Sequence, residues 1–205
     1  MSKKLNGLYV ISDDILTPKE TILEQIEKAL KGGASIVQLR DKISSDEQIE
    51  YLVKDLENLC EKYKALFVLN DRVELAIKLK CSGLHIGESD YHRIETIRKD
   101  FDGILGISCY GDAKTAKQME DLGADYVAFG SFFTSPTKPN SKVVNKEVLS
   151  EAKSILNIPI CAIGGITLEN SLELLDRKTN MLAVISDIWK EKDIEAKCKK
   201  YKEKF

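Results

Sequence analysis

Polar side chains recur in this chain where short apolar runs end. Gln38, Arg40 and Lys42 alternate at the end of one such run, so a β-strand would point all three to the same side. An amide, a guanidinium and an ammonium group together suit the oxygens of a phosphorylated ligand. The alternative is that Arg40 and Lys42 are solvated loop charges paired with Asp41 or Asp46.

Two carboxylates follow the next two apolar runs. Asp71 lies in Asn70-Asp71-Arg72, directly after the run at 65–69, and Asp90 follows the run at 83–86. Mg²⁺ prefers oxygen ligands and is commonly shared with substrate phosphates, so the pair predicts a magnesium site. The alternative is that both residues N-cap the helices that follow, which is a common role for Asp at such positions.

A segment rich in hydroxyl groups follows the apolar run at 126–130. Ser135, Thr137 and Lys138 place two hydroxyls and one ammonium within four residues, and Pro136 and Pro139 stiffen the segment. This composition suits an anionic ligand. The alternative is a Pro-rich surface turn without a ligand.

Two further segments offer backbone N–H groups. Gly164-Gly165 ends the seventh apolar run, and Ile185-Ser186 ends the eighth. Glycine permits a close approach to the backbone, and (β/α)8 barrels often bind phosphate after strands seven and eight. The two segments therefore predict a phosphate site.

Eight apolar runs can position these groups. The runs are short, β-branched and continuously apolar, as expected for parallel strands covered on both faces, and they lie at 8–12, 35–39, 65–69, 83–86, 104–108, 126–130, 158–163 and 181–186. Amphipathic segments such as 19–33 and 46–63 separate them. Eight such units favour one (β/α)8 TIM barrel domain over residues 1–205. An open doubly wound sheet is the rival, but no Gly-rich dinucleotide motif follows the first run.

Composition argues against several classes of function. The chain has 31 Lys and Arg against 33 Asp and Glu, so no overall field favours nucleic acid or an anionic membrane. The sequence contains no run of about 18 apolar residues, which is the length that a membrane-spanning helix needs. The five scattered cysteines predict reduced thiols in a cytoplasmic protein, not a zinc site. His85 lies inside a strand-like run, so we expect a pocket wall or core residue there, not a general base.

The motifs taken in chain order resemble those of a known family. YVISD, VQLRDK, NDR, GLHIGESD, GIS, TSPTKP, IGGI and AVIS are similar to the motifs of the thiamine phosphate synthase family, from residue 9 to about residue 186. Members of that family are (β/α)8 barrels. The resemblance implies a transferase that joins hydroxymethylpyrimidine diphosphate to the thiazole phosphate, or to its carboxylated form. The products would be thiamine phosphate and pyrophosphate, by a Mg²⁺-assisted dissociative mechanism.

The resemblance also implies roles for single residues. It assigns Gln38, Arg40, Lys42, Asn70 and Ser108 to the pyrimidine diphosphate, Lys138 to the diphosphate, and Ser135, Thr137, Gly165, Ile185 and Ser186 to the thiazole phosphate. It assigns Asp71 and Asp90 to Mg²⁺. Arg40, Lys42 and Lys138 would stabilise the charge that develops on the departing pyrophosphate. A homodimer is also compatible with the family.

Two departures from the family pattern bear on these roles. Glu88 stands where the family usually has Gln, which adds a negative charge near the predicted magnesium site. Residues 177–182 replace the usual Gly-Ala-Asp-Gly approach to the last strand, which bears on where that strand lies.

Two other functions stay open. One is a barrel like the thiazole tautomerases, which need not keep the diphosphate and Mg²⁺ residues. The other is a non-catalytic barrel that binds a phosphorylated ligand.

Overall fold

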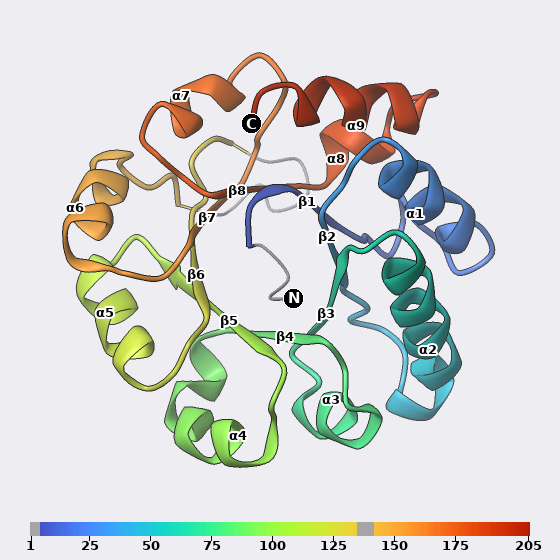
Figure 1. Cartoon of the computed structure of the whole chain (residues 1–205), viewed down its shortest axis with the longest axis horizontal. Coiled ribbons are helices and arrows are strands. Elements are labelled where there is room, and N and C mark those ends of the chain that lie inside the picture. Colours follow the sequence, from blue (N-terminus) through green and yellow to red (C-terminus); the bar gives the residue numbers. More distant parts are fainter. Residues whose placement is uncertain (1–4, 135–141) are drawn as a thin grey trace.

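Eight parallel strands close into a barrel in the computed structural model, which describes residues 5–134 and 142–205 (Figure 1). Each strand hydrogen-bonds to the next along the chain, and the last returns to the first. The strands are β1 (Gly7–Ile11), β2 (Ile36–Leu39), β3 (Leu66–Asn70), β4 (Gly83–Ile86), β5 (Ile104–Tyr110), β6 (Tyr126–Phe129), β7 (Ile160–Ile163) and β8 (Met181–Val184). The predicted (β/α)8 TIM barrel is therefore confirmed.

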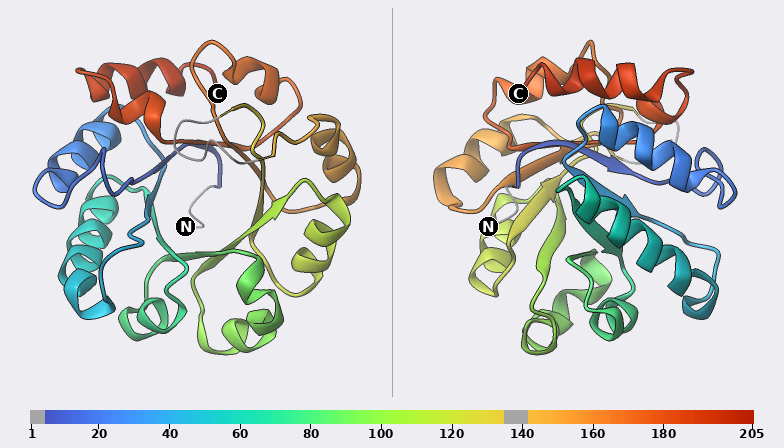
Figure 2. Two further views of the ribbon diagram at one scale, coloured as in Figure 1. Left: turned by 180° about the vertical axis from the view of Figure 1, so that it is seen from behind. Right: turned by 45° about the vertical axis from the view of Figure 1, so that its right-hand side comes forward.

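The helices form an outer ring around the strands, as both views of Figure 2 show. They are α1 (Ile22–Lys31), α2 (Asp46–Lys62), α3 (Val73–Leu79), α4 (Ile94–Asp100), α5 (Ala113–Asp121), α6 (Glu147–Ile155), α7 (Ser171–Leu175), α8 (Ser186–Trp189) and α9 (Ile194–Lys202). A 3-10 helix, η1 (Glu88–Arg93), precedes α4. Helix α9 packs beside α1, so the last helix and the first complete the ring (Figure 1).

Local sequence signals explain where the longest helix begins and which face it buries. Ser45 N-caps α2 and forms a capping box with Gln48, which satisfies two otherwise unpaired backbone donors. Ile49, Leu52 and Leu56 recur at helical spacing and are buried against the barrel. The apolar stripe thus fixes the rotation of α2 against the strands.

The barrel has two separate apolar layers because side chains alternate along each strand. Residues that face outward pack against the helices, whereas a smaller cluster fills the interior and includes Tyr9, Ile36, Val68 and Tyr126. Polar residues also occur in the interior, since Gln38 is only 2% exposed. Buried polar groups need hydrogen-bond partners, and their partners decide how the site is built.

The unusual segment at 177–182 does not displace the eighth strand. The backbone of Asn180 donates to Ile160 O at 2.8 Å and accepts from Gly7 N at 2.9 Å, and its side chain accepts from Ile160 N at 2.9 Å. Asn180 therefore joins β8 to both neighbouring strands. The strand ends at Val184, so the predicted strand at 181–186 is two residues too long, and Ser186 instead opens α8.

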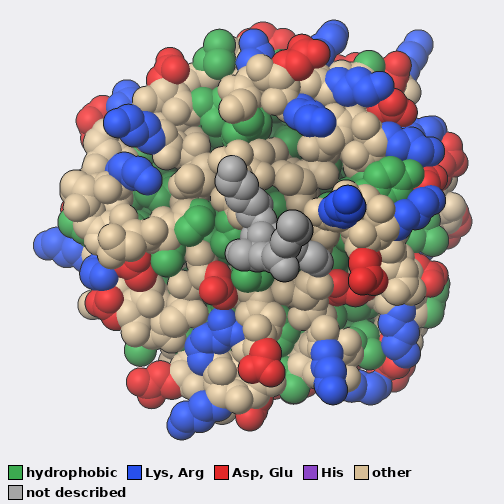
Figure 3. All heavy atoms as spheres, in the orientation of Figure 1, with side chains coloured by type: hydrophobic (Ala, Val, Ile, Leu, Met, Phe, Trp, Pro, Cys, Tyr) green, Lys and Arg blue, Asp and Glu red, His purple; other side chains and the backbone are tan. Residues whose placement is uncertain are grey.

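Charges of both signs are interspersed on the surface. On the face shown in Figure 3, Lys and Arg side chains alternate with Asp and Glu side chains around the rim, and neither sign forms a continuous patch. Within residues 5–134 and 142–205, no helix is long and apolar enough to cross a membrane. All five cysteines are buried, and none of them forms a disulfide.

We expect Gly106→Ala to destabilise the barrel. An added Cβ at Gly106 would lie 1.9 Å from Cζ of Tyr126, whose ring fills the interior beside β5. Overpacking of this kind typically costs about 1–3 kcal/mol of unfolding free energy. Gly87→Ala is the matched control, since the nearest atom to its added Cβ is Tyr110 Oη at 3.7 Å. Urea unfolding measures both, and equal midpoints for the two variants would contradict the expected clash.

Candidate active site

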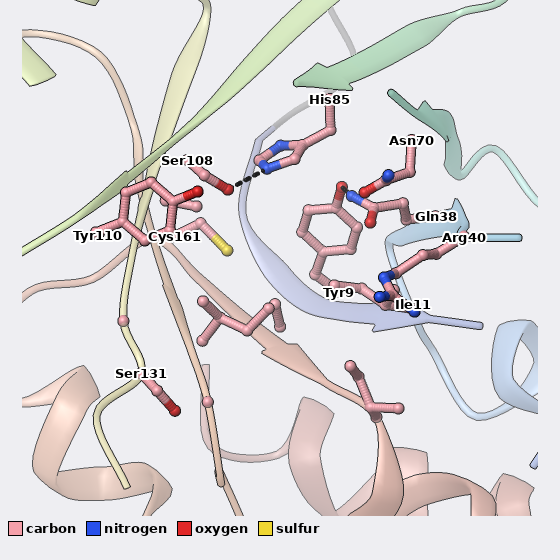
Figure 4. Close-up of a pocket in the computed structure, with 16 residues that line it drawn as sticks. Tyr9, Ile11, Gln38, Arg40, Asn70, His85, Ser108, Tyr110, Ser131 and Cys161 are labelled. Carbon is pink, nitrogen blue, oxygen red and sulfur yellow. Dashed lines mark hydrogen bonds between the residues drawn. The ribbon is translucent and has the colours of Figure 1, made fainter. Parts of the chain in front are cut away.

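A pocket opens into the barrel where the strands end, and it gathers five of the predicted binding residues. Gln38, Arg40, Asn70, Ser108 and Ile185 all line it, although they come from three different strands and from the residues that follow β2 and β8. Figure 4 shows labelled side chains from opposite walls pointing into this one space. The remaining lining is Tyr9, Ile11, His85, Tyr110, Ala128, Gly130, Ser131, Cys161, Ile163, Gly164 and Ala183. The pocket thus combines a largely apolar wall with a few polar groups, as small-molecule sites do.

Arg40 presents an unneutralised positive charge at this pocket. Its backbone is fixed by Ser12, which accepts from Arg40 N at 2.8 Å. Within the described part of the chain, no carboxylate forms an ion pair with its guanidinium. The alternative pairing with Asp41 or Asp46 is therefore wrong for Arg40, because those two carboxylates are paired with Lys19 and Arg72.

Lys42 and Asp71 lie in contact on the rim of the barrel mouth. They form an ion pair and line a second hollow together with Arg40, Asn70 and Glu88. The alternative pairing of Lys42 with Asp41 or Asp46 is therefore wrong as well. This hollow shares Arg40 and Asn70 with the inner pocket, so the two spaces are continuous.

Neither predicted metal ligand caps a helix. The N-cap residues of α3 and α4 are Arg72 and Arg93, and neither helix has a side-chain cap bond. Asp90 instead accepts from Ser89 Oγ at 3.0 Å and pairs with Arg93 at 3.3 Å. The capping alternative is therefore wrong, although each oxygen of Asp90 already has one partner.

The donor chemistry of this rim fits Mg²⁺. Asp71 on the rim and Asp90, which follows the lining residue Ser89 in the chain, offer only oxygen donors, and the ammonium of Lys42 already places a cation against Asp71. Across the residues that the structure describes, no cluster of three or more His, Cys, Asp or Glu side chains could hold a metal ion by itself. An ion that takes its remaining ligands from substrate and water suits such a site, and Mg²⁺ commonly binds in this way.

A separate cavity lies beside the pocket at the ends of β7 and β8. Gly165 and Ser186 line it together with Thr134, Ile166, Thr167, Asp187, Lys190 and Glu191. Gly165 has φ +63°, and an added Cβ would lie 2.4 Å from Thr134 O, so this position needs glycine. Asn170 Nδ2 donates to Gly165 O at 3.0 Å and stabilises the turn. The predicted residues Ser135, Thr137 and Lys138 lie outside the described residues.

Three titratable groups that line the inner pocket, His85, Cys161 and Tyr9, are held neutral by burial. Burial lowers the pKa of His85 to about 4, although the nearby Asp71 acts in the opposite direction. Burial also raises the pKa of the Cys161 thiol and the Tyr9 hydroxyl far above their usual values. At neutral pH the inner pocket therefore offers neither a thiolate nor an imidazolium. His85 lines the wall as expected.

Two residues that shape the site were not among the predicted ones. Tyr9 lines the pocket, and Tyr126 lies beneath it with no exposed surface. The signal was the same alternation that identified Gln38, since Tyr9 and Ile11 also point inward from one strand.

Arg72 has a structural role that its position in the NDR motif did not reveal. It donates to Asp41 O at 2.8 Å and Ser44 O at 2.6 Å.

Comparisons with known proteins agree on one family. The family model described as thiamine monophosphate synthase matches residues 8–188. A thiamine-phosphate synthase from Wolinella succinogenes is 45% identical, over 91% of this chain and 86% of that protein. One from Nitrosococcus oceani is 39% identical, over 100% of this chain and 95% of that protein. The solved structure of a thiamine phosphate pyrophosphorylase from Pyrococcus furiosus has a TM-score of 0.87 and 31% identity, and covers 98% of this chain and 96% of that chain.

We expect Arg72→Ala to loosen the loop that carries Lys42. The substitution removes two hydrogen bonds to loop carbonyls and the ion pair with Asp46, at a side chain only 16% exposed. Charged hydrogen bonds contribute about 1.5–3 kcal/mol each, so amide exchange at residues 40–46 should rise at least tenfold. Lys54→Ala, which breaks an exposed pair on α2, is the control. Unchanged exchange in the loop would show that Arg72 does not hold it.

Proposed function

We propose that this chain, which belongs to the thiamine monophosphate synthase family, joins hydroxymethylpyrimidine diphosphate to the thiazole phosphate and releases pyrophosphate. The chain is a transferase of that family. The observation that carries the proposal is the continuity of an apolar pocket with a rim where Arg40, Lys42 and Asp71 meet. A flat aromatic ring fits the first space, and its diphosphate fits the second.

In this proposal the rim receives the diphosphate. The unpaired guanidinium of Arg40 and the ammonium of Lys42 bind its oxygens, and Lys138 adds a third cation as the sequence motif implies. Asp71 and Asp90 would hold Mg²⁺. When bound, Mg²⁺ supplies positive charge that offsets the charge of the diphosphate oxygens. Arg40, Lys42 and Lys138 then favour departure of pyrophosphate, because they stabilise the charge that develops on it.

The inner pocket suits a reaction without a protein nucleophile. The amino group of the pyrimidine can stabilise the cation that remains when pyrophosphate leaves, and the thiazole nitrogen then attacks that cation. Cys161 and Tyr9 stay protonated, because burial raises the pKa of each. A neutral, largely apolar wall therefore excludes competing nucleophiles from the reacting carbon.

The second cavity suits the phosphate of the thiazole substrate. Gly165 and Ser186 line this cavity, whereas Ile185, the neighbour of Ser186 in the chain, lines the inner pocket. Ser135 and Thr137 would complete the phosphate contacts by the sequence motif. Supplying the carboxylated and the decarboxylated thiazole phosphate together, and comparing how fast each is consumed, decides which form is preferred.

Purified protein incubated with both substrates and Mg²⁺ should form thiamine phosphate and pyrophosphate. Removal of Mg²⁺ with excess EDTA should abolish product formation, and added Mg²⁺ should restore it. Liquid chromatography detects the thiamine phosphate. Conversion between thiazole isomers with no thiamine phosphate would favour the tautomerase alternative, and binding without turnover would favour a non-catalytic barrel.

Asp71→Asn and Lys138→Ala should each lower kcat by about 100-fold or more, because the first removes a proposed Mg²⁺ ligand and the second removes a cation proposed to stabilise the departing diphosphate. The thermal unfolding midpoint of Asp71→Asn should change little, since the Asp71 side chain is 35% exposed on the rim. Lys54→Ala supplies a matched charge deletion far from the mouth. Near-wild-type turnover in both site variants would overturn the proposed diphosphate site.

A further inference from the structure

A chain of hydrogen bonds crosses the barrel interior, and four of its five residues line the pocket. Gln38 Nε2 donates to Tyr9 Oη at 2.7 Å, and Tyr9 Oη lies 2.9 Å from Tyr126 Oη. Tyr126 Oη lies 2.9 Å from His85 Nδ1, and His85 Nε2 lies 2.8 Å from Ser108 Oγ. The last of these contacts is visible in Figure 4. This series of hydrogen bonds thus connects Gln38 and Ser108, two of the residues predicted to bind the pyrimidine substrate. It does so through three residues that were not predicted to bind substrate.

The donor and the acceptor of each hydrogen bond in this series follow from the number of protons available, starting at Gln38. Gln38 Nε2 carries hydrogens and has no acceptor capacity, so Tyr9 must accept there and give its single proton to Tyr126. Tyr126 then has only one proton left to give, and its remaining partner is His85 Nδ1. That nitrogen must accept, so Nε2 carries the ring hydrogen and donates to Ser108 Oγ.

The direction of the chain leaves one free hydrogen at its far end. Ser108 Oγ already accepts from His85, so its own hydroxyl hydrogen is available to the pocket that it lines. Burial makes this assignment costly to break. Tyr9, Gln38 and Tyr126 are each at most 2% exposed, and water cannot replace a lost partner there.

We propose that Tyr9, Tyr126 and His85 are positioning residues that fix Ser108 as a hydrogen-bond donor to an unprotonated ring nitrogen of the pyrimidine substrate. The identity of that ligand rests on the proposed function. The direction of the hydrogen-bond chain is a property of the protein without substrate, so it can be tested separately from the proposed function. A ring that carries a hydrogen at that nitrogen would meet a second donor, so the chain selects against such rings.

The tautomer of His85 tests the direction without any substrate. A long-range ¹H–¹⁵N spectrum of the free protein should show His85 protonated at Nε2 alone, with its signals distinguished from those of the exposed His92 by a His92→Gln variant. Protonation at Nδ1 in the wild type would mean that the chain runs the other way, and it would overturn the proposal.

Substitutions along the chain should move that tautomer in a defined manner. Tyr9→Phe removes the link to Gln38 without burying a charge, so His85 should become a mixture of tautomers. Gln38→Glu offers an acceptor to Tyr9 and should reverse the chain, which places the hydrogen on Nδ1. Tyr91→Phe is the matched control, because its hydroxyl donates to the Ser108 backbone outside the chain. A pure Nε2 tautomer in Tyr9→Phe would show that Gln38 does not set the direction.

Kinetics then connect the chain to substrate choice. Tyr126→Phe should raise KM for the pyrimidine diphosphate about tenfold, as expected for one weakened hydrogen bond, and leave KM for the thiazole phosphate unchanged. An equal rise in KM for both substrates would show that Tyr126 has only a structural role. If no thiamine phosphate forms at all, the proposed function fails, whereas the tautomer spectra still decide the direction of the chain.

Discussion

The hydrogen bonds between β8 and β1 are the constraint on which the rest of the structure depends. A parallel sheet of eight strands becomes a ring only when these two strands pair, and the ring leaves no open edge. Closure brings all eight carboxyl ends to one mouth. It also fixes the level of each inward side chain, since Ile11 is in register with Gln38 and Asn70 with His85. Residues far apart in the sequence therefore share one pocket.

Closure also creates a narrow interior in which every polar atom needs a partner. The five-residue hydrogen-bond chain meets that need, and Gly106 leaves room for the ring of Tyr126 at its centre. Among side-chain atoms of the described residues, only Arg177 Nε is buried without a partner, and it lies outside the barrel interior. A satisfied network is rigid, and a rigid floor can hold a ligand ring in one orientation.

The strands and much of the site could be predicted because both follow from alternation along short apolar runs. Gln38, Asn70 and Ser108 face the pocket for the same reason that Val37 and Leu39 face the helices. What could not be predicted depends on contacts across the fold. Arg72 reaches back to the loop at 41–46, and Tyr126 bonds partners from β1 and β4. The end of β8 was also missed, because the apolar run continues past Val184 to Ile185, which is the N-cap of α8.

The charges at the mouth explain why a phosphorylated substrate would need help from a metal ion. The whole chain carries a net charge of only −2, so attraction of an anion must be local. Arg40 and Lys42 face the rim hollow, but Asp71 and Glu88 line the same hollow, and Asp90 lies next to it along the chain. Among the described residues that line this hollow, two cations face two carboxylates, so they supply no net positive charge for a diphosphate. In the proposed function, a divalent cation held by Asp71 and Asp90 would add the positive charge that a diphosphate needs. The carboxylates that would repel the substrate alone thus become the means of binding it.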